Sequence, residues 1–141
     1  MTTIAYKDGI IAHDSRVSAG GTIYDDNCDK RVKVEDTYFF FVGETAGEAD
    51  LADWFLHRKR TEQLGDTHAM VFYGGALYTI GYDKKKGYYS NPERLANVTA
   101  IGSGSICALT AMDLGCTARE AVKMAMKRDT ATGGRIRTHT L

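Results

Sequence analysis

The order of hydrophobic and polar residues predicts β-strands through the first third of the chain. Lys7-Asp8-Gly9 separates two hydrophobic runs, and Asp-Gly between such runs is a strong hairpin signal. The run from Tyr38 to Val42 is apolar on both faces, which is typical of a central strand covered on both sides. We expect strands at residues 2–7, 9–15 and 22–25, and two more within 31–42 that are broken near residues 35–36.

The pattern changes to a helical period after Gly43. Leu51, Trp54 and Phe55 share one face of a helix that we expect over residues 45 to about 64. Further along we expect a hairpin at 69–74 and 76–82, a loop at 83–96, a strand at 98–101, helices at about 104–114 and from 117, and a strand at 135–140. Strands and helices in separate runs predict a single α+β domain over residues 1–141, with two antiparallel sheets packed together and helices outside.

Charge and composition narrow the classes of function. Lys+Arg and Asp+Glu both number 18 in 141 residues, and this balance argues against a general nucleic-acid or anionic-membrane binder. Three cysteines, with no CxxC pair, indicate free thiols and a reducing, cytoplasmic setting. No apolar run approaches the roughly 18 residues of a membrane span. The four histidines are scattered without HxxxH or HExxH spacing, which gives a metal site little support.

Thr2 is the first candidate for chemistry. Methionine before a small residue is usually removed, so we expect Met1 to be trimmed and Thr2 to carry a free α-amine. An α-amine has a pKa of about 7.7–8.0, and it can therefore accept the proton of the threonine hydroxyl near neutral pH. The alternative is that Met-Thr is an ordinary start without a catalytic role.

Asp14 and Lys30 form the second candidate group. A hairpin between the first two strands returns Asp14 to the neighbourhood of Thr2. An ammonium group close to Thr2 would lower the pKa of its hydroxyl, and an aspartate would hold that ammonium in place. A surface ion pair of little energetic value is the alternative.

Three glycine-rich turns supply further polar groups. GSGS at 102–105 is a strand-to-helix turn that could present Ser103, or less plausibly cradle a phosphate. The segment DTATGG at 129–134 is a second polar turn. Gly43 lies at another strand-to-helix turn, where its amide could serve as an oxyanion donor. Each of these, taken alone, could also be plain turn chemistry.

Several short motifs in this order resemble the Ntn-hydrolase superfamily. The closest resemblance is to proteasome β-subunits, and among them to the bacterial ATP-dependent proteasome-like peptidase that pairs with an AAA+ unfoldase. The resembling stretches are TTIAYKDGIIAHDSR at 2–16, DKRV at 29–32, VGETAGEAD at 42–50, AIGSGS at 100–105, TAREAV at 117–122 and DTATGG at 129–134.

The resemblance implies a fold and a set of roles. The fold is a four-layer αββα sandwich of two antiparallel sheets flanked by helices. Thr2 would be the nucleophile, Asp14 would orient the catalytic lysine, and that lysine would be Lys30 or, as a fallback, Lys33. The Gly43 amide would form the oxyanion hole. The group around the threonine amine would be Ser103, Asp129 and Thr132, and the substrate pocket would be lined by Cys28, Phe41 and Thr45.

The implied function is threonine endopeptidase activity on unfolded polypeptides inside a self-compartmentalised homo-oligomeric ring, with an AAA+ unfoldase as partner. No cofactor is expected beyond a structural monovalent or divalent cation near the Gly133 turn. The chain has no room for the second long helix that the family carries before the hairpin at 69–82, so one outer helix should be shortened or missing, and stacking of two rings is left open.

Two other functions stay open. An Ntn-type amidohydrolase acting on a small amide would share the nucleophile but would not need a ring. A catalytically silent structural subunit of the same fold would keep the architecture without the chemistry. Native mass distinguishes the amidohydrolase, which needs no ring, from a compartmentalised peptidase. Labelling by a threonine-directed probe distinguishes both enzymes from the silent subunit, which should not be labelled at Thr2.

Overall fold

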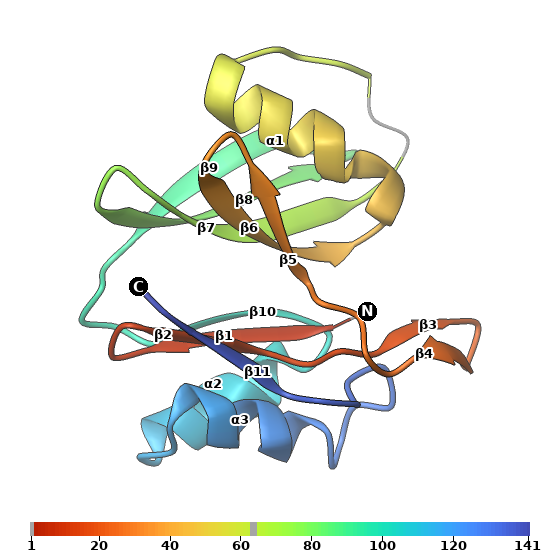
Figure 1. Cartoon of the computed structure of the whole chain (residues 1–141), viewed down its shortest axis with the longest axis vertical. Coiled ribbons are helices and arrows are strands. Elements are labelled where there is room, and N and C mark those ends of the chain that lie inside the picture. The colour runs from red at the N-terminus through yellow and green to blue at the C-terminus, as the bar shows by residue number, and fades with distance from the viewer. Residues whose placement is uncertain (1, 63–64) are drawn as a thin grey trace. The chain divides into compact units, whose positions relative to one another are not determined.

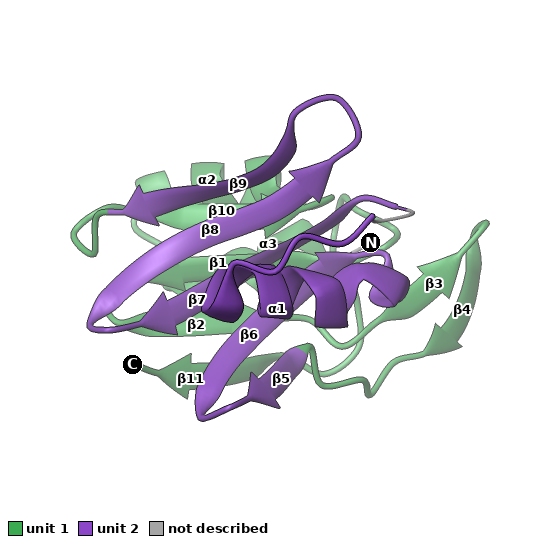
Figure 2. Cartoon of the chain, turned by 90° about the horizontal axis from the view of Figure 1, so that it is seen from above, with its two compact units in different colours: residues 1–30, 94–141 green, residues 31–93 purple. Residues whose placement is uncertain are grey.

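The structure is a computed structural model that describes residues 2–62 and 65–141. Its strands, helices and one short 3-10 helix follow each other along the chain as Figure 1 shows. They are β1 (Thr3–Lys7), β2 (Ile10–His13), β3 (Val17–Ala19), β4 (Thr22–Asp25), β5 (Arg31–Val34), β6 (Thr37–Gly43), η1 (Thr45–Gly47), α1 (Glu48–His57), β7 (Thr67–Tyr73), β8 (Ala76–Asp83), β9 (Gly87–Glu93), β10 (Thr99–Gly102), α2 (Ser105–Asp113), α3 (Ala118–Ala125) and β11 (Arg137–Thr140). The chain divides into two compact units, residues 1–30 with 94–141 (unit 1) and residues 31–93 (unit 2), which are coloured separately in Figure 2.

Unit 1 is built on a four-stranded antiparallel sheet in the order β10-β1-β2-β11. The hairpin between β1 and β2 turns at Asp8 and Gly9, whose φ angles of 50° and 78° suit aspartate and glycine. Helices α2 and α3 cover one face of this sheet (Figure 1). The small side chains of Ala5 and Ala12 pack against α2 and α3 residues in one buried cluster, so the helices can approach the sheet closely.

Helix α3 begins with the capping box that its sequence predicts. The side chain of Thr117 accepts a hydrogen bond from the amide of Glu120, and the Glu120 carboxylate accepts one from the amide of Thr117. The buried residues of α3 are the four apolar ones of its inner face, Ala118, Ala121, Val122 and Ala125. This helix is therefore fixed at its start by local chemistry and along its length by burial.

Unit 2 is a five-stranded antiparallel sheet in the order β5-β6-β7-β8-β9, with α1 packed against β7 and β8. Phe39 and Phe41 of β6 join Leu51, Trp54 and Phe55 of α1 in its hydrophobic cluster. The residues from Phe39 to Val42 are each at most 4% exposed. The prediction of a central strand covered on both faces is therefore confirmed.

The α+β class and the predicted hairpins are confirmed, while two predicted elements are wrong. Helix α1 ends at His57 instead of near residue 64, because Arg58 adopts a left-handed φ of 57° that closes the helix. Leu64 lies outside the described residues. Residues 83–96 are not a loop, because β9 pairs with β8 through a turn that ends at Gly87. Pro92 is accommodated there because β9 is the edge strand of its sheet.

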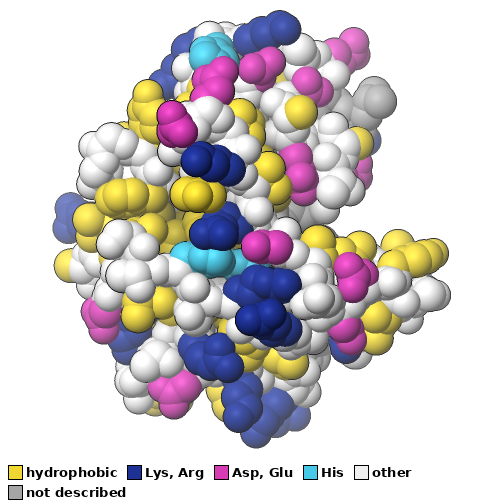
Figure 3. All heavy atoms as spheres, viewed as in Figure 1, with side chains coloured by type: hydrophobic (Ala, Val, Ile, Leu, Met, Phe, Trp, Pro, Cys, Tyr) yellow, Lys and Arg dark blue, Asp and Glu magenta, His cyan; other side chains and the backbone are white. Residues whose placement is uncertain are grey.

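Three further features of the described residues are a small separate sheet, the distribution of charge and the character of the helices. Strands β3 and β4 form a separate two-stranded sheet, of which β3 was not predicted. Acidic and basic side chains are interspersed over the face seen in Figure 3, in keeping with the formal net charge of zero. Within the described part of the chain, no helix combines the length and the apolar character needed to cross a membrane.

Candidate functional site

Thr2 and Asp14 lie side by side in unit 1, at the end of the β1–β2 hairpin away from its turn. The Thr2 hydroxyl donates a hydrogen bond to Oδ1 of Asp14. Both residues are buried, with Thr2 1% and Asp14 0% exposed. Pairing of β1 with β2 places them together, since Ile4 lies opposite His13 in the antiparallel register. Met1, whose removal the sequence predicts, lies outside the described residues.

Asp14 accepts hydrogen bonds from three backbone amides as well. The amide of Thr3 donates to Oδ1 at 3.2 Å, and those of Gly133 and Arg16 donate to Oδ2 at 2.9 Å and 3.3 Å. Burial raises the pKa of Asp14 above its usual value, against the opposing effects of the Gly133 and Thr3 amides and the Lys30 ammonium. The carboxylate is thus a buried acceptor that joins the start of the chain to the 129–134 turn.

Lys30 lies within electrostatic reach of Asp14, as its influence on the Asp14 pKa indicates. Its ammonium donates a hydrogen bond to the carbonyl of Arg16 at 2.6 Å. Lys33, the fallback for the same role, belongs to β5 of unit 2, where its ammonium lies 3.5 Å from Asp36. The Lys30 ammonium therefore acts on Asp14 electrostatically and contacts a backbone carbonyl, and the choice between Lys30 and Lys33 stays a prediction.

Ser103, Asp129 and Thr132 form a second hydrogen-bonded group in unit 1. The hydroxyls of Ser103 and Thr132 both donate to Oδ2 of Asp129, at 2.5 Å and 2.6 Å. The amide of Ala131 donates to Oδ1 at 3.1 Å. Partial burial acts to raise the pKa of Asp129, but these hydrogen bonds outweigh it, and the pKa lies below its usual value.

Thr3 connects the two groups and was not among the predicted site residues. Its hydroxyl lies 2.7 Å from that of Thr132, while its amide binds Asp14. Since the Thr132 hydroxyl donates to Asp129, the Thr3 hydroxyl is the donor between the two threonines. The signal for Thr3 is weak in sequence, because a threonine at the start of a strand is ordinary.

Two glycines permit this close packing. A Cβ on Gly102, whose φ is 101°, would lie 1.8 Å from the carbonyl oxygen of Thr2. A Cβ on Gly104 would lie 2.1 Å from the Thr3 hydroxyl oxygen. The GSGS turn is therefore glycine-rich because it packs against the start of β1.

Arg16 is a second residue that sequence reasoning missed. Its guanidinium pairs with Asp26 at 2.8 Å and donates to the carbonyl of Thr130 at 3.1 Å. A Cβ on Gly133 would lie 2.3 Å from the central carbon of that guanidinium. A bound cation near the Gly133 turn stays a prediction. The Arg16 guanidinium already places a positive charge beside this turn.

The remaining predicted residues occupy different settings. Cys28 is half-buried in unit 1, and its amide donates to the carbonyl of Ser15 at 3.0 Å. In unit 2, Phe41 is 3% exposed within the hydrophobic cluster, and Thr45 is exposed at the start of η1. Gly43 ends β6 with a φ of 93°, and a Cβ there would lie 2.5 Å from the Asp66 carbonyl oxygen. This close approach is itself a reason for glycine at position 43.

His13, which precedes Asp14, is fully buried at the end of β2. Burial lowers the pKa of its imidazole to about 4, although a hydrogen bond with the Asp14 carbonyl acts in the opposite direction. Its Nε2 faces His139 and Asp29, a group that no sequence spacing indicates.

Comparison of the sequence with models of known protein families and with curated proteins finds no match. Six of the predicted residues, Thr2, Asp14, Lys30, Ser103, Asp129 and Thr132, belong to one connected region of unit 1.

Proposed function

We propose that the chain is an N-terminal threonine peptidase that cleaves unfolded polypeptides inside a self-compartmentalised homo-oligomer. The observation that carries the proposal is the hydrogen bond from the Thr2 hydroxyl to buried Asp14. Residues separated by more than a hundred positions meet around it, including Asp129 and Thr132. A hydroxyl, a carboxylate and a nearby ammonium are the groups that activation of a threonine nucleophile needs.

The proposed reaction begins with the mature chain starting at Thr2. The Thr2 hydroxyl oxygen attacks a peptide carbonyl while its proton passes to the free α-amine of the same residue. A backbone amide stabilises the resulting oxyanion, and Gly43 remains the residue that the sequence predicts for this role. Collapse of this intermediate breaks the C–N bond, the leaving amine takes the proton from the α-ammonium, and an acyl ester remains on Thr2.

Water then completes the cycle. The α-amine accepts a proton from water, and the hydroxide attacks the ester carbonyl. The C–O bond to Thr2 then breaks, the acid product leaves, and the α-ammonium returns the proton to the Thr2 oxygen. Asp14 holds the Thr2 hydroxyl through its hydrogen bond until the hydroxyl hydrogen turns to the freed α-amine. The positive charge of Lys30, which acts on Asp14, would favour the ionised hydroxyl. Ser103, Asp129 and Thr132 fix the environment of the α-amine through their shared hydrogen bonds.

Access to the nucleophile is part of the proposal. Thr2 is 1% exposed, so a polypeptide can reach its hydroxyl only after neighbouring groups move. Removal of Met1 supplies the base of the proposed reaction, because it frees the α-amine of Thr2.

The finer features of the fold and assembly belong to the same proposal. Each unit taken singly is a helix layer on an antiparallel sheet, which supports a four-layer αββα sandwich. Among the described residues between α1 and β7 there is no second helix, which supports an outer helix that is shortened or missing. Cys28, Phe41 and Thr45 remain the residues that the sequence predicts for substrate binding, and an AAA+ unfoldase is the proposed partner.

Hydrolysis of an unstructured protein tests the proposal. The wild-type protein should release new amino termini from casein, and Thr2→Ala should abolish this while leaving the fold intact by circular dichroism. Thr2→Ser is the matched control, since serine keeps a hydroxyl and an α-amine and should retain measurable cleavage. Equal cleavage by wild type and Thr2→Ala would overturn the assignment of Thr2.

A further inference from the structure

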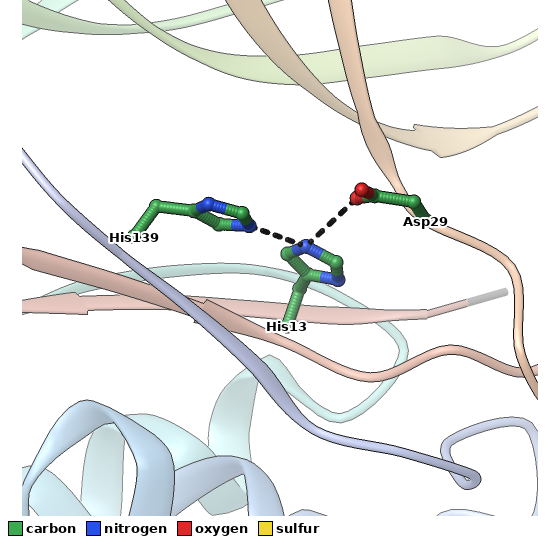
Figure 4. Close-up of side chains that lie close together, drawn as sticks. All are labelled: His13, Asp29 and His139. Atoms are coloured by element: carbon green, nitrogen blue, oxygen red, sulfur yellow. Dashed lines mark hydrogen bonds and ion pairs between the residues drawn. The ribbon is translucent and has the colours of Figure 1, made fainter.

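Three side chains of metal-ligating type meet in unit 1 on the sheet face opposite helices α2 and α3 (Figure 4). They are His13 at the end of β2, His139 in β11 and Asp29 in the segment that follows β4. Nε2 of His13 lies 3.2 Å from Nε2 of His139 and 3.4 Å from Oδ1 of Asp29. One ligand atom from each of the three lies within 4.8 Å of the others.

The local fold brings the three together for simple reasons. His13 lies opposite Arg137 in the β2–β11 register, so His139 is two residues further along the neighbouring strand and shares its face. The segment that carries Asp29 is held beside the end of β2 by the hydrogen bond between the Cys28 amide and the Ser15 carbonyl at 3.0 Å. The separation of these residues along the chain explains why spacing motifs did not reveal the group.

The distances suit a tetrahedral ion. Zinc binds imidazole nitrogen and carboxylate oxygen at about 2.0–2.2 Å, so neighbouring ligand atoms around it lie about 3.3–3.5 Å apart. The two measured separations, 3.2 Å and 3.4 Å, are of this size. The two imidazole ring centroids lie 5.3 Å apart, and two imidazoles that share one tetrahedral zinc are expected at roughly 5 Å.

The tautomer of His13 suits a ligand too. Its Nδ1 lies 2.7 Å from the carbonyl oxygen of Asp14, and a carbonyl only accepts, so Nδ1 carries a hydrogen. In the neutral imidazole this leaves the lone pair on Nε2, the atom that faces His139 and Asp29. A backbone carbonyl that holds the far nitrogen of a histidine is the usual second-sphere contact of histidine ligands.

We propose that His13, His139 and Asp29 form a binding site for a zinc-class divalent transition metal, with the fourth position taken by water. Two imidazoles and one carboxylate favour Zn²⁺ and Co²⁺ over Mg²⁺, which prefers oxygen ligands. The bound ion joins β2, β11 and the segment that leads to Lys30. Arg137 brings positive charge nearby, but its guanidinium is engaged by Ser15, Asn27 and the Cys28 carbonyl.

The test is metal binding by the whole chain, with any affinity tag removed. Co²⁺ serves as the spectroscopic probe, because tetrahedral Co²⁺ absorbs visible light strongly and octahedral Co²⁺ does so only weakly. The expected result is one tetrahedral Co²⁺ per chain, displaced by Zn²⁺ and unaffected by Mg²⁺, with a higher Tm in the presence of Zn²⁺. The Thr2→Ala variant should bind identically, so the result does not depend on peptide cleavage.

Two variants locate the ion. His139→Ala and Asp29→Asn should each weaken Zn²⁺ binding by at least about tenfold, while His57→Ala, which removes an exposed histidine of unit 2, should leave it unchanged. Asp29 is exposed, so Asp29→Asn remains informative even if a histidine variant fails to fold. The site is overturned if the wild type shows no tetrahedral Co²⁺ spectrum, or if both cluster variants bind as tightly as His57→Ala.

Discussion

Asp14 is the residue on which the candidate site most depends. Its Oδ1 accepts from the Thr2 hydroxyl and the Thr3 amide, and its Oδ2 accepts from the amides of Gly133 and Arg16. A buried carboxylate is costly unless it is surrounded by donors, and here backbone groups supply most of them. The residue therefore organises both the start of the chain and the 129–134 turn.

Replacement of Asp14 tests that dependence. Asp14→Asn would direct an amide NH₂ group at one or at two backbone N–H donors, depending on its orientation, and we expect a loss of about 1–3 kcal/mol in the free energy of unfolding. This loss should exceed the gain from removing a buried charge. Urea unfolding measures it, with Asp8→Asn in the exposed β1–β2 turn as the control. An Asp14→Asn protein as stable as the control would contradict the assigned role.

The pKa of Asp129 gives a prediction about acid stability. Because its folded-state pKa lies below the ordinary value of 3.8, ionised Asp129 stabilises the fold above that pH. The contribution is lost as the pH falls through the folded-state pKa. Asp129→Asn should therefore show a smaller loss of stability than wild type between about pH 5 and pH 2.

The measurement is urea unfolding at several pH values through this range. Asp36→Asn, at a side chain that is 97% exposed, is the matched control for removal of one carboxylate. Identical pH profiles for wild type and Asp129→Asn would show that the hydrogen bonds from Ser103 and Thr132 do not stabilise the carboxylate.

At the scale of elements, the contact between β10 and the start of β1 positions Thr2. Thr3 lies opposite Gly102 in the antiparallel register. The missing side chain at position 102 leaves room for the carbonyl of Thr2, and the left-handed φ of 101° directs the chain into the GSGS turn. One glycine thus meets two requirements, of space and of backbone conformation.

A pair of alanine substitutions separates these two requirements. Gly9→Ala introduces only the strain of a positive φ, since no atom lies within 4 Å of its Cβ, and it should cost about 1–2 kcal/mol. Gly102→Ala adds a clash with the Thr2 carbonyl oxygen, and its cost should exceed that of Gly9→Ala by at least ~2 kcal/mol. Chemical denaturation gives both values. Equal costs would mean that β10 and the start of β1 do not approach as closely as described.

The elements also show what sequence could predict. Local signals located the hairpin at Asp8-Gly9, the capping box at Thr117 and the central strand β6, because each depends on neighbouring residues. Strand β9 was missed because its pairing with β8 is supported by the whole sheet, and an edge position tolerates Pro92. The early end of α1 depends on a left-handed Arg58, a conformation that its sequence does not signal.

The candidate site, too, could be predicted from sequence only where local signals mark its residues. Polar residues in turns, such as Ser103 and Asp129, could be selected from sequence because glycine-rich turns are visible there. The link through Thr3 and the group of His13, Asp29 and His139 could not, because they arise from strand register and distant segments. Contacts of this kind are set by tertiary packing, for which one sequence gives no direct signal.

At the scale of the whole molecule, the proposed compartment requires self-association. The β3–β4 hairpin pairs with no other described strand and exposes apolar side chains, with Ile23 50% and Tyr24 71% exposed. Exposed apolar groups gathered on one short element are typical of an interaction surface. We expect this hairpin to contact a second copy of the chain.

Native mass spectrometry and light scattering test the assembly. The wild-type protein should have the mass of a closed oligomer, several times the 15.5 kDa of one chain. Tyr24→Asp should reduce that mass, whereas Leu114→Asp, at an exposed apolar residue outside the hairpin, should not. A monomeric wild type would rule out a compartment and leave an amidohydrolase that acts on small amides as the better reading of the same nucleophile.

The central claim is that Thr2 is an N-terminal nucleophile with its own amine as base. Its most direct test is intact-mass spectrometry of the purified protein before and after treatment with a peptide epoxyketone, which reacts with a hydroxyl and an α-amine of the same residue. The mature chain should begin at Thr2 and gain one inhibitor per site, with the adduct mapped to Thr2 and absent from Thr2→Ala. A chain that keeps Met1, or one that begins at Thr2 and takes up no inhibitor, would show that Thr2 is not such a nucleophile.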